Sequence, residues 1–230
     1  MKRERIEIGD IPALIWGEAS DRVCLCVHGK MSCKEEAEGI ARIACEKGYQ
    51  TVSFDLPRHG ERIDSLQRCD IWNGKRDLKL IADYVFTRWR EARLYACSLG
   101  AFFSLHVYRE YPFTKCLFQS PIVDMEHLIQ KMMQWFEITE ERLQREQEID
   151  TPIDVLSWQY LQYIRENPTD RWSIPTCILF AGKDNLQSPK IMSDFAERFH
   201  CQLTVSKFSC HPFMEDDDIP VVEEWLRNNL

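Results

Sequence analysis

The chain has 230 residues, of which 44% are hydrophobic and 29% are charged, and its formal net charge is −8. This length suits one domain with a continuous core, which we predict over residues 1–230. A net negative charge argues against nucleic acid or an anionic membrane as a partner, because both require clustered Lys and Arg.

The chain shows no sign of an export signal or a membrane anchor. No apolar run of signal-peptide length follows Met1–Glu7, and no window approaches the roughly 18 uninterrupted apolar residues of a membrane span. The ten cysteines include no C-x-x-C pair, which weakens zinc and thioredoxin-type redox interpretations. We therefore expect a cytoplasmic protein with reduced, mostly buried thiols, no membrane insertion and no metal site.

Short apolar runs alternate with longer amphipathic runs along the chain. The first part predicts a hairpin over 5–8 and 13–16, a strand over 23–27, a helix over 35–47 and a strand over 51–54. The middle part predicts a helix over 77–89, a strand ending at 97, a helix over 99–109 and a strand over 115–118. The last part predicts strands over 174–180 and 202–205, and helices over 189–199 and 215–229. This alternation is typical of an α/β fold, a mainly parallel central sheet flanked by helices on both faces.

One segment interrupts the alternation. Residues 124–171 show no strand pattern, only helical stretches rich in charge and in large apolar side chains. Nearly fifty residues are too many for a plain connection between two core strands. We therefore predict that residues 124–171 form an inserted helical cap over the carboxyl edge of the sheet.

The most informative local pattern surrounds Ser98. An apolar run ends at this serine, a helix-forming run follows, and the small residues Ala96 and Gly100 stand two places to either side. Such a sequence predicts a sharp strand-to-helix turn that exposes the serine hydroxyl, although Ala96 replaces the first glycine of the usual G-x-S-x-G pattern.

Further polar motifs follow the other predicted strands of the sheet. They are His28-Gly29 after 23–27, the run from Asp55 to Arg62 after 51–54, Ala181-Gly182-Lys183-Asp184 after 174–180, and His211 after the last strand. Because open α/β sheets place their sites at the carboxyl ends of the strands, we expect these motifs to converge near Ser98.

In these motifs and in their order, Ser then Asp then His, the chain resembles the α/β-hydrolase superfamily. The sequence motif from Asp55 to Arg62 most resembles the motifs of small esterases and of the prolyl-oligopeptidase-like branch. The resemblance implies a catalytic triad of Ser98, Asp184 and His211, in which the serine is the nucleophile and the histidine the base. It also implies that the backbone N–H groups of Lys30 and Leu99 form the oxyanion hole.

The expected activity is hydrolysis of a carboxylic ester, or a thioester, through an acyl-enzyme, with a small-molecule ester as the substrate. No metal or organic cofactor is implied, because side chains alone supply the nucleophile. A small peptidase and a non-catalytic binding protein on the same fold remain alternatives, and the oligomeric state is open. Asp124 could replace Asp184 as the acid, whereas Cys97 occupies a position whose side chain should point away from the site.

Large apolar side chains in and near the predicted cap are candidates for an acyl pocket, although they could equally form the core of the cap itself. They are Met31, Met132, Met133, Trp135, Phe136 and Trp158.

Overall fold

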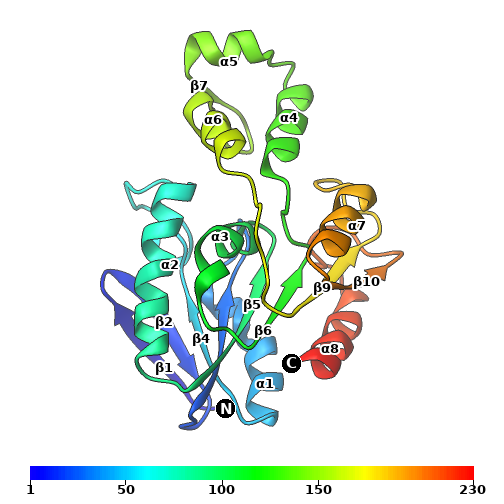
Figure 1. Cartoon of the computed structure of the whole chain (residues 1–230). Coiled ribbons are helices and arrows are strands. Elements are labelled where there is room, and N and C mark those ends of the chain that lie inside the picture. Colours follow the sequence, from blue (N-terminus) through cyan, green and yellow to red (C-terminus); the bar gives the residue numbers. More distant parts are fainter.

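The computed structural model describes all residues 1–230 and is built around one eight-stranded sheet (Figure 1). The strands lie in the order β1-β2-β4-β3-β5-β6-β9-β10. Only β1 and β2, and β2 and β4, pair antiparallel; the other five pairs are parallel. The bounds are β1 (Arg3–Ile8), β2 (Ile11–Trp16), β3 (Arg22–Val27), β4 (Gln50–Phe54), β5 (Glu91–Cys97), β6 (Lys115–Gln119), β9 (Thr176–Ala181) and β10 (Gln202–Ser206). The predicted hairpin and the predicted, mainly parallel sheet are confirmed.

Helices cover both faces of the sheet and enclose two separate cores. The larger core includes side chains of α2 (Ile71–Phe86), α3 (Leu99–Val107) and α7 (Pro189–Arg198). The second core includes side chains of α1 (Glu38–Glu46) and α8 (Asp218–Asn229) on the other face. Val23 and Leu25 of β3 belong to the first core, whereas Cys24 and Cys26 belong to the second. Burial on both faces explains why this strand is apolar at every position rather than at alternate ones.

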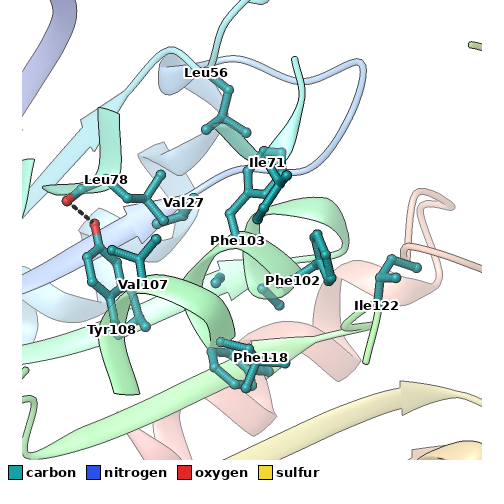
Figure 2. Close-up of a cluster of buried hydrophobic side chains, with 14 of the residues drawn as sticks. Val27, Leu56, Ile71, Leu78, Phe102, Phe103, Val107, Tyr108, Phe118 and Ile122 are labelled. Atoms are coloured by element: carbon teal, nitrogen blue, oxygen red, sulfur yellow. Dashed lines mark hydrogen bonds between the residues drawn. The ribbon is translucent and has the colours of Figure 1, made fainter. Parts of the chain in front are cut away.

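Helix α3 is anchored deep in the larger core (Figure 2). Phe102 and Phe103 are fully or almost fully buried, and the hydroxyl of Tyr108, just after the helix, donates to the carbonyl oxygen of Leu78 in α2 at 3.0 Å. The residues packed around α3 come from several elements: Val27, Leu56, Ile71, Phe118 and Ile122. This packing fixes the position of the turn that precedes the helix, which contains Ser98.

Three helices differ in extent from the sequence prediction. Helix α1 begins at Glu38 rather than at 35, because a 3₁₀ helix precedes it. Helix α2 begins at Ile71, because the carboxylate of Asp70 accepts the Asn73 N–H at 2.9 Å and caps the helix, and it ends at Phe86. Helix α8 begins at Asp218 rather than at 215. Short 3₁₀ helices occupy Lys34–Ala37, Gly60–Arg62 and Tyr108–Glu110. None of the helices is long and apolar enough to cross a membrane.

Residues 124–171, which we call the cap segment, project beyond the carboxyl ends of the central strands (Figure 1). The cap segment contains α4 (Met125–Trp135), α5 (Glu140–Glu146) and α6 (Trp158–Glu166), as its helical periodicity predicted. It also contains a hairpin of β7 (Glu148–Asp150) and β8 (Val155–Ser157), so the prediction that it lacks strands was wrong. Each of these strands has three residues and β7 is largely polar, which leaves too short a pattern to recognise in the sequence.

Candidate active site

Ser98 stands in a strained turn between β5 and α3. Its φ of 49° and ψ of −116° place it in a region that residues with a side chain rarely adopt. A Cβ atom on Gly100 would lie 2.4 Å from the carbonyl oxygen of His28 and 2.6 Å from that of Val27, so only glycine fits there. Ala96, in contrast, is accommodated without exposure between Val27 and Phe118 of the neighbouring strands. The turn has the geometry of a nucleophile elbow.

Ser98, His211 and Asp184 form a continuous hydrogen-bonded chain. The Ser98 Oγ lies 2.8 Å from the His211 Nε2, and the His211 Nδ1 lies 2.7 Å from the Asp184 Oδ2. The second carboxylate oxygen of Asp184 accepts the N–H groups of Leu186 and Gln187 at 2.7 and 3.0 Å. Since Asp184 Oδ2 can only accept, the His211 Nδ1 carries the proton and its Nε2 is free to accept the serine proton.

The other candidate acid, Asp124, has a different role in the structure. Its carboxylate caps α4 by accepting the His127 N–H at 2.9 Å. The side-chain amide of Gln187 bonds to the backbone N–H and C=O of Asp124 at 2.9 and 3.0 Å, which ties the start of the cap segment to the loop after β9. The carboxylate that contacts His211 is therefore Asp184, and Asp124 is a helix cap.

The thiol of Cys97, which precedes Ser98 in the chain, is unreactive at neutral pH. Burial raises the pKa of Cys97 to about 12, so this thiol stays protonated and is a poor nucleophile at neutral pH. All ten cysteines are free; Cys24, Cys26, Cys116 and Cys177 are buried, and Cys210 is exposed. No group of three or more His, Cys, Asp or Glu side chains is arranged to hold a metal ion.

Two buried histidines fix the peptide groups on either side of Lys30. The His28 Nε2 accepts the Leu56 N–H at 3.0 Å, so its Nδ1 carries the proton and donates to the Gly29 carbonyl at 2.7 Å. The Gly29 carbonyl and the Lys30 N–H belong to one trans peptide and point in opposite directions. The His28 bond therefore sets the direction of the Lys30 N–H, which has no acceptor within the protein.

His59 secures the next peptide in the same way. Its Nδ1 donates to the Pro57 carbonyl at 2.8 Å, and its Nε2 accepts the Met31 N–H at 3.0 Å. Burial lowers the pKa of both histidines, that of His28 to about 4, so both rings are neutral at pH 7 and keep these bonds. Leu99, directly after Ser98, begins α3, where the first N–H groups have no acceptor within the helix.

The side chain of Lys30 reaches the cap segment. Its ammonium donates to the Ile153 carbonyl at 3.0 Å and forms an ion pair with Asp154, both in the turn between β7 and β8. The residue that carries one candidate oxyanion donor is thus also the residue that fastens the cap segment over the site.

Three cavities lie next to one another near Lys30 and Ile153, and both residues line all three. The small cavity, about 160 Å³, touches Ser98 and Leu99 and extends under α4. The histidine-side cavity, about 510 Å³, touches Ser98 and His211. The outer cleft, about 700 Å³, touches neither Ser98 nor His211 and contains several charged side chains.

This chain is similar to known proteins in its three-dimensional structure and not detectably in its sequence. No protein-family model matches the chain, and no curated protein is similar enough in sequence to be called a relative. Est1E from Butyrivibrio proteoclasticus, solved with ferulic acid bound, is 14% identical and superimposes with a TM-score of 0.78 over 98% of this chain and 96% of its own. The mouse alpha/beta hydrolase domain-containing protein 10 is also 14% identical, with a TM-score of 0.76 over 99% and 98% of the two chains. This chain has the α/β-hydrolase fold.

Two further similar structures carry descriptions of their activity. The esterase Pf2001 from Pyrococcus furiosus is 17% identical, with a TM-score of 0.68 over 99% of this chain and 92% of its own. The thioesterase domain from the curacin biosynthetic pathway is 15% identical, with a TM-score of 0.60 over 98% of both chains. At these identities the similarity establishes the α/β-hydrolase fold alone.

The structure separates the six predicted pocket residues into two groups, those that line a cavity and those that do not. Met132 and Trp135 line the small cavity, and Met31, 91% exposed, lines the histidine-side cavity and the outer cleft. Met133, Phe136 and Trp158 line none of the three cavities and pack against the larger core instead.

Sequence reasoning missed most of the small cavity. Its remaining apolar wall includes Ile122, Met125, Leu128, Ile129, Leu156 and Leu186. Four of the α4 residues, Met125, Leu128, Ile129 and Met132, recur at the spacing of one helix face, a signal that was available in the sequence. The direction in which that face points was not available.

Proposed function

We propose that this protein is a serine hydrolase that cleaves a carboxylic ester or thioester through an acyl-enzyme. The observation that carries the proposal is the unbroken chain from Ser98 Oγ to His211 Nε2 at 2.8 Å and from His211 Nδ1 to Asp184 Oδ2 at 2.7 Å. A serine hydroxyl becomes an effective nucleophile when an adjacent base takes its proton, and this geometry places the His211 Nε2 there.

In the first half of the reaction, the Ser98 Oγ bonds to the carbonyl carbon of the ester while its proton moves to the His211 Nε2. The bond between the carbonyl carbon and the leaving oxygen then breaks, and the same proton passes from Nε2 to that oxygen. Asp184 keeps the proton on Nδ1 and stabilises the imidazolium. In the second half, water replaces the alcohol along the same route, which releases the acid and restores Ser98.

The negative charge that develops on the carbonyl oxygen needs donors that are already in place. The Lys30 N–H, directed by His28 and His59, and the Leu99 N–H at the start of α3 are suited to this role. One such donor lowers the barrier by about 3–4 kcal/mol in serine hydrolases, because it reorganises little during the reaction. We assign the oxyanion hole to these two backbone groups.

The descriptions of the similar structures support ester or thioester chemistry rather than another reaction on this fold, since they include esterases and a thioesterase. We also propose that residues 1–230 form one domain in which the cap segment is an insertion. A triad that is complete and hydrogen-bonded favours an enzyme over a non-catalytic binding protein.

The proposal is tested by labelling the protein with a fluorophosphonate, which reacts with activated serines. We expect a single adduct on the peptide that contains Ser98. Ser98→Ala should abolish labelling and lower turnover of p-nitrophenyl butanoate by up to about 10⁶-fold, the scale seen when a serine nucleophile is removed. Ser193→Ala, at an exposed serine on α7, is the matched control and should leave both unchanged. Labelling that persists in Ser98→Ala would place the nucleophile elsewhere.

A further inference from the structure

The two cavities that touch Ser98 differ in size and in their relation to His211. We infer that the substrate is an ester with a short apolar acyl group and a bulkier, largely apolar alcohol. The inference rests on the proposed function, because it uses the route of the proton in the Ser98 mechanism to decide which cavity receives which part of the substrate.

The position of His211 assigns the alcohol. The leaving oxygen must receive its proton from the His211 Nε2, so it has to lie within hydrogen-bond reach of that atom when the acyl bond breaks. Of the two cavities that touch Ser98, only the histidine-side cavity is also lined by His211. The alcohol therefore lies in the histidine-side cavity, about 510 Å³ in volume.

The acyl group is left with the small cavity. Once Ser98 holds the acyl carbon and the carbonyl oxygen faces the Lys30 and Leu99 N–H groups, the chain can continue under α4, where the small cavity lies. The buried side chains of Ile129 and Met132 form part of its wall. Its volume of about 160 Å³ is less than a third of the roughly 510 Å³ of the histidine-side cavity. The small cavity therefore holds a shorter chain than the histidine-side cavity does.

The chemistry of the histidine-side cavity selects an uncharged alcohol. Its polar side chains are already engaged: Gln119 donates to the Pro212 carbonyl and accepts from the Tyr95 hydroxyl, both at 2.8 Å, and the Lys34 ammonium is paired with Asp55 at 2.7 Å. Glu36 brings a negative charge to the same cavity, and the Lys30 ammonium there is already paired with Asp154, so an anionic leaving group is disfavoured. Much of the remaining lining is apolar, including Ile40, Phe54 and Met214.

The outer cleft is a less favourable place for a long acyl chain than the histidine-side cavity is for a long alcohol. It shares eight lining residues with the small cavity, including Leu99, Ile153 and Tyr160, and beyond them the charged side chains of Arg58, Arg68 and Glu148 stand among apolar ones such as Ile63 and Trp72. A methylene group beside these charged side chains gains less than it would in an apolar pocket, because the charged groups retain their own hydration.

A pair of isomeric esters tests the inference directly. Octyl butanoate and butyl octanoate have the same formula and the same ester group, and they differ only in which side carries the long chain. Each methylene that is buried rather than left in water contributes about fourfold to binding. With four methylenes exchanged between the two sides, we expect kcat/KM for octyl butanoate to exceed that for butyl octanoate by at least about tenfold. The rates are measured by titrating the released acid at constant pH.

Two matched substitutions locate the effect. Ile40 lines only the histidine-side cavity and Leu128 only the small one, and both are half-buried. Ile40→Trp should lower the ratio of kcat/KM for octyl butanoate to that for methyl butanoate by at least about tenfold, with the acyl group held constant. Leu128→Trp should lower kcat/KM for methyl butanoate relative to methyl acetate, with the alcohol held constant.

The outcomes separate this inference from the proposed function. Equal rates for the two isomers, or a faster reaction of butyl octanoate, would overturn the inference while leaving the serine hydrolase assignment intact. Failure to hydrolyse either isomer, together with an unlabelled Ser98, would instead overturn the proposed function. If Ile40→Trp, in a protein that still unfolds cooperatively, lowered kcat/KM for methyl butanoate relative to methyl acetate, the acyl group would lie in the histidine-side cavity and the inference would also be refuted.

Discussion

Replacing Asp184 with Asn changes one atom of the proposed triad and keeps nearly all of its packing. In Asp184→Asn, the side-chain amide oxygen would still accept the N–H groups of Leu186 and Gln187, which the carboxylate accepts at 2.7 and 3.0 Å. The amide nitrogen, however, would replace the oxygen that lies 2.7 Å from the His211 Nδ1. Two N–H donors would then face each other, so the imidazole should move its proton to Nε2 and lose the ability to accept from Ser98.

The size of the effect follows from that change of tautomer. In serine proteases the same substitution lowers kcat about 10⁴-fold while the geometry stays intact. A loss of about 10⁴ corresponds to roughly 5 kcal/mol in the activation free energy, at about 1.4 kcal/mol for each factor of ten. Because the Asp184 side chain is completely buried and its other bonds survive, we expect the loss to appear in kcat with little change in KM.

The assay is the steady-state hydrolysis of p-nitrophenyl butanoate at pH 7.5, with thermal unfolding of each variant as the measure of folding. Asp124→Asn is the matched control, because Asn caps a helix about as well as Asp and this carboxylate does not contact His211. We expect its kcat to stay within about threefold of the wild type. If Asp124→Asn lost activity and Asp184→Asn retained it, the assignment of the acid from the structure would be refuted.

Two further predictions concern the framework of the site. Gly100→Ala would place a methyl group 2.4 Å from the His28 carbonyl oxygen. This substitution should therefore lower the free energy of unfolding, measured in urea, by about 1–3 kcal/mol and should also lower kcat. In the control Gly39→Ala, in α1, the added methyl group meets nothing within 4 Å, so the free energy of unfolding should rise by about 0.5–1 kcal/mol. Equal effects of the two substitutions would contradict the close approach at Gly100. Burial lowers the pKa of His28 to about 4, below the value near 6.5 of the unfolded chain, so the unfolded state binds the proton more readily. The contribution of the neutral His28 ring to the free energy of unfolding is roughly 3 kcal/mol. It is complete above about pH 6.5 and is lost as the pH falls through about 4. His28→Gln should be less stable at pH 7 but should lose less stability between pH 7 and 4; an unchanged pH dependence in this variant would show that His28 is not the titrating group.

The sequence by itself determined the features that depend on short stretches of chain. The apolar run of β3 predicted a strand, and the small residues around Ser98 predicted a sharp turn, because the constraints behind both patterns act within a few residues. The order of the polar loops was also readable, since parallel strands bring their carboxyl ends to one edge. From these features followed the mainly parallel sheet and, through the resemblance of the motifs to the α/β-hydrolase superfamily, the candidate residues Ser98, Asp184 and His211.

The tertiary structure decided what depends on how distant segments pack together. The periodicity of α4 marks an apolar face but does not say whether that face meets a cavity or another helix, so Met132 lines the small cavity while Met133 packs into the core. The contacts of Lys30 with Ile153 and Asp154 join segments more than 120 residues apart, and no local pattern encodes such a pair. The division of space around Ser98 into a small cavity and a larger one on the His211 side arises from these packing choices, because a cavity is the volume that side chains from many elements together leave unfilled.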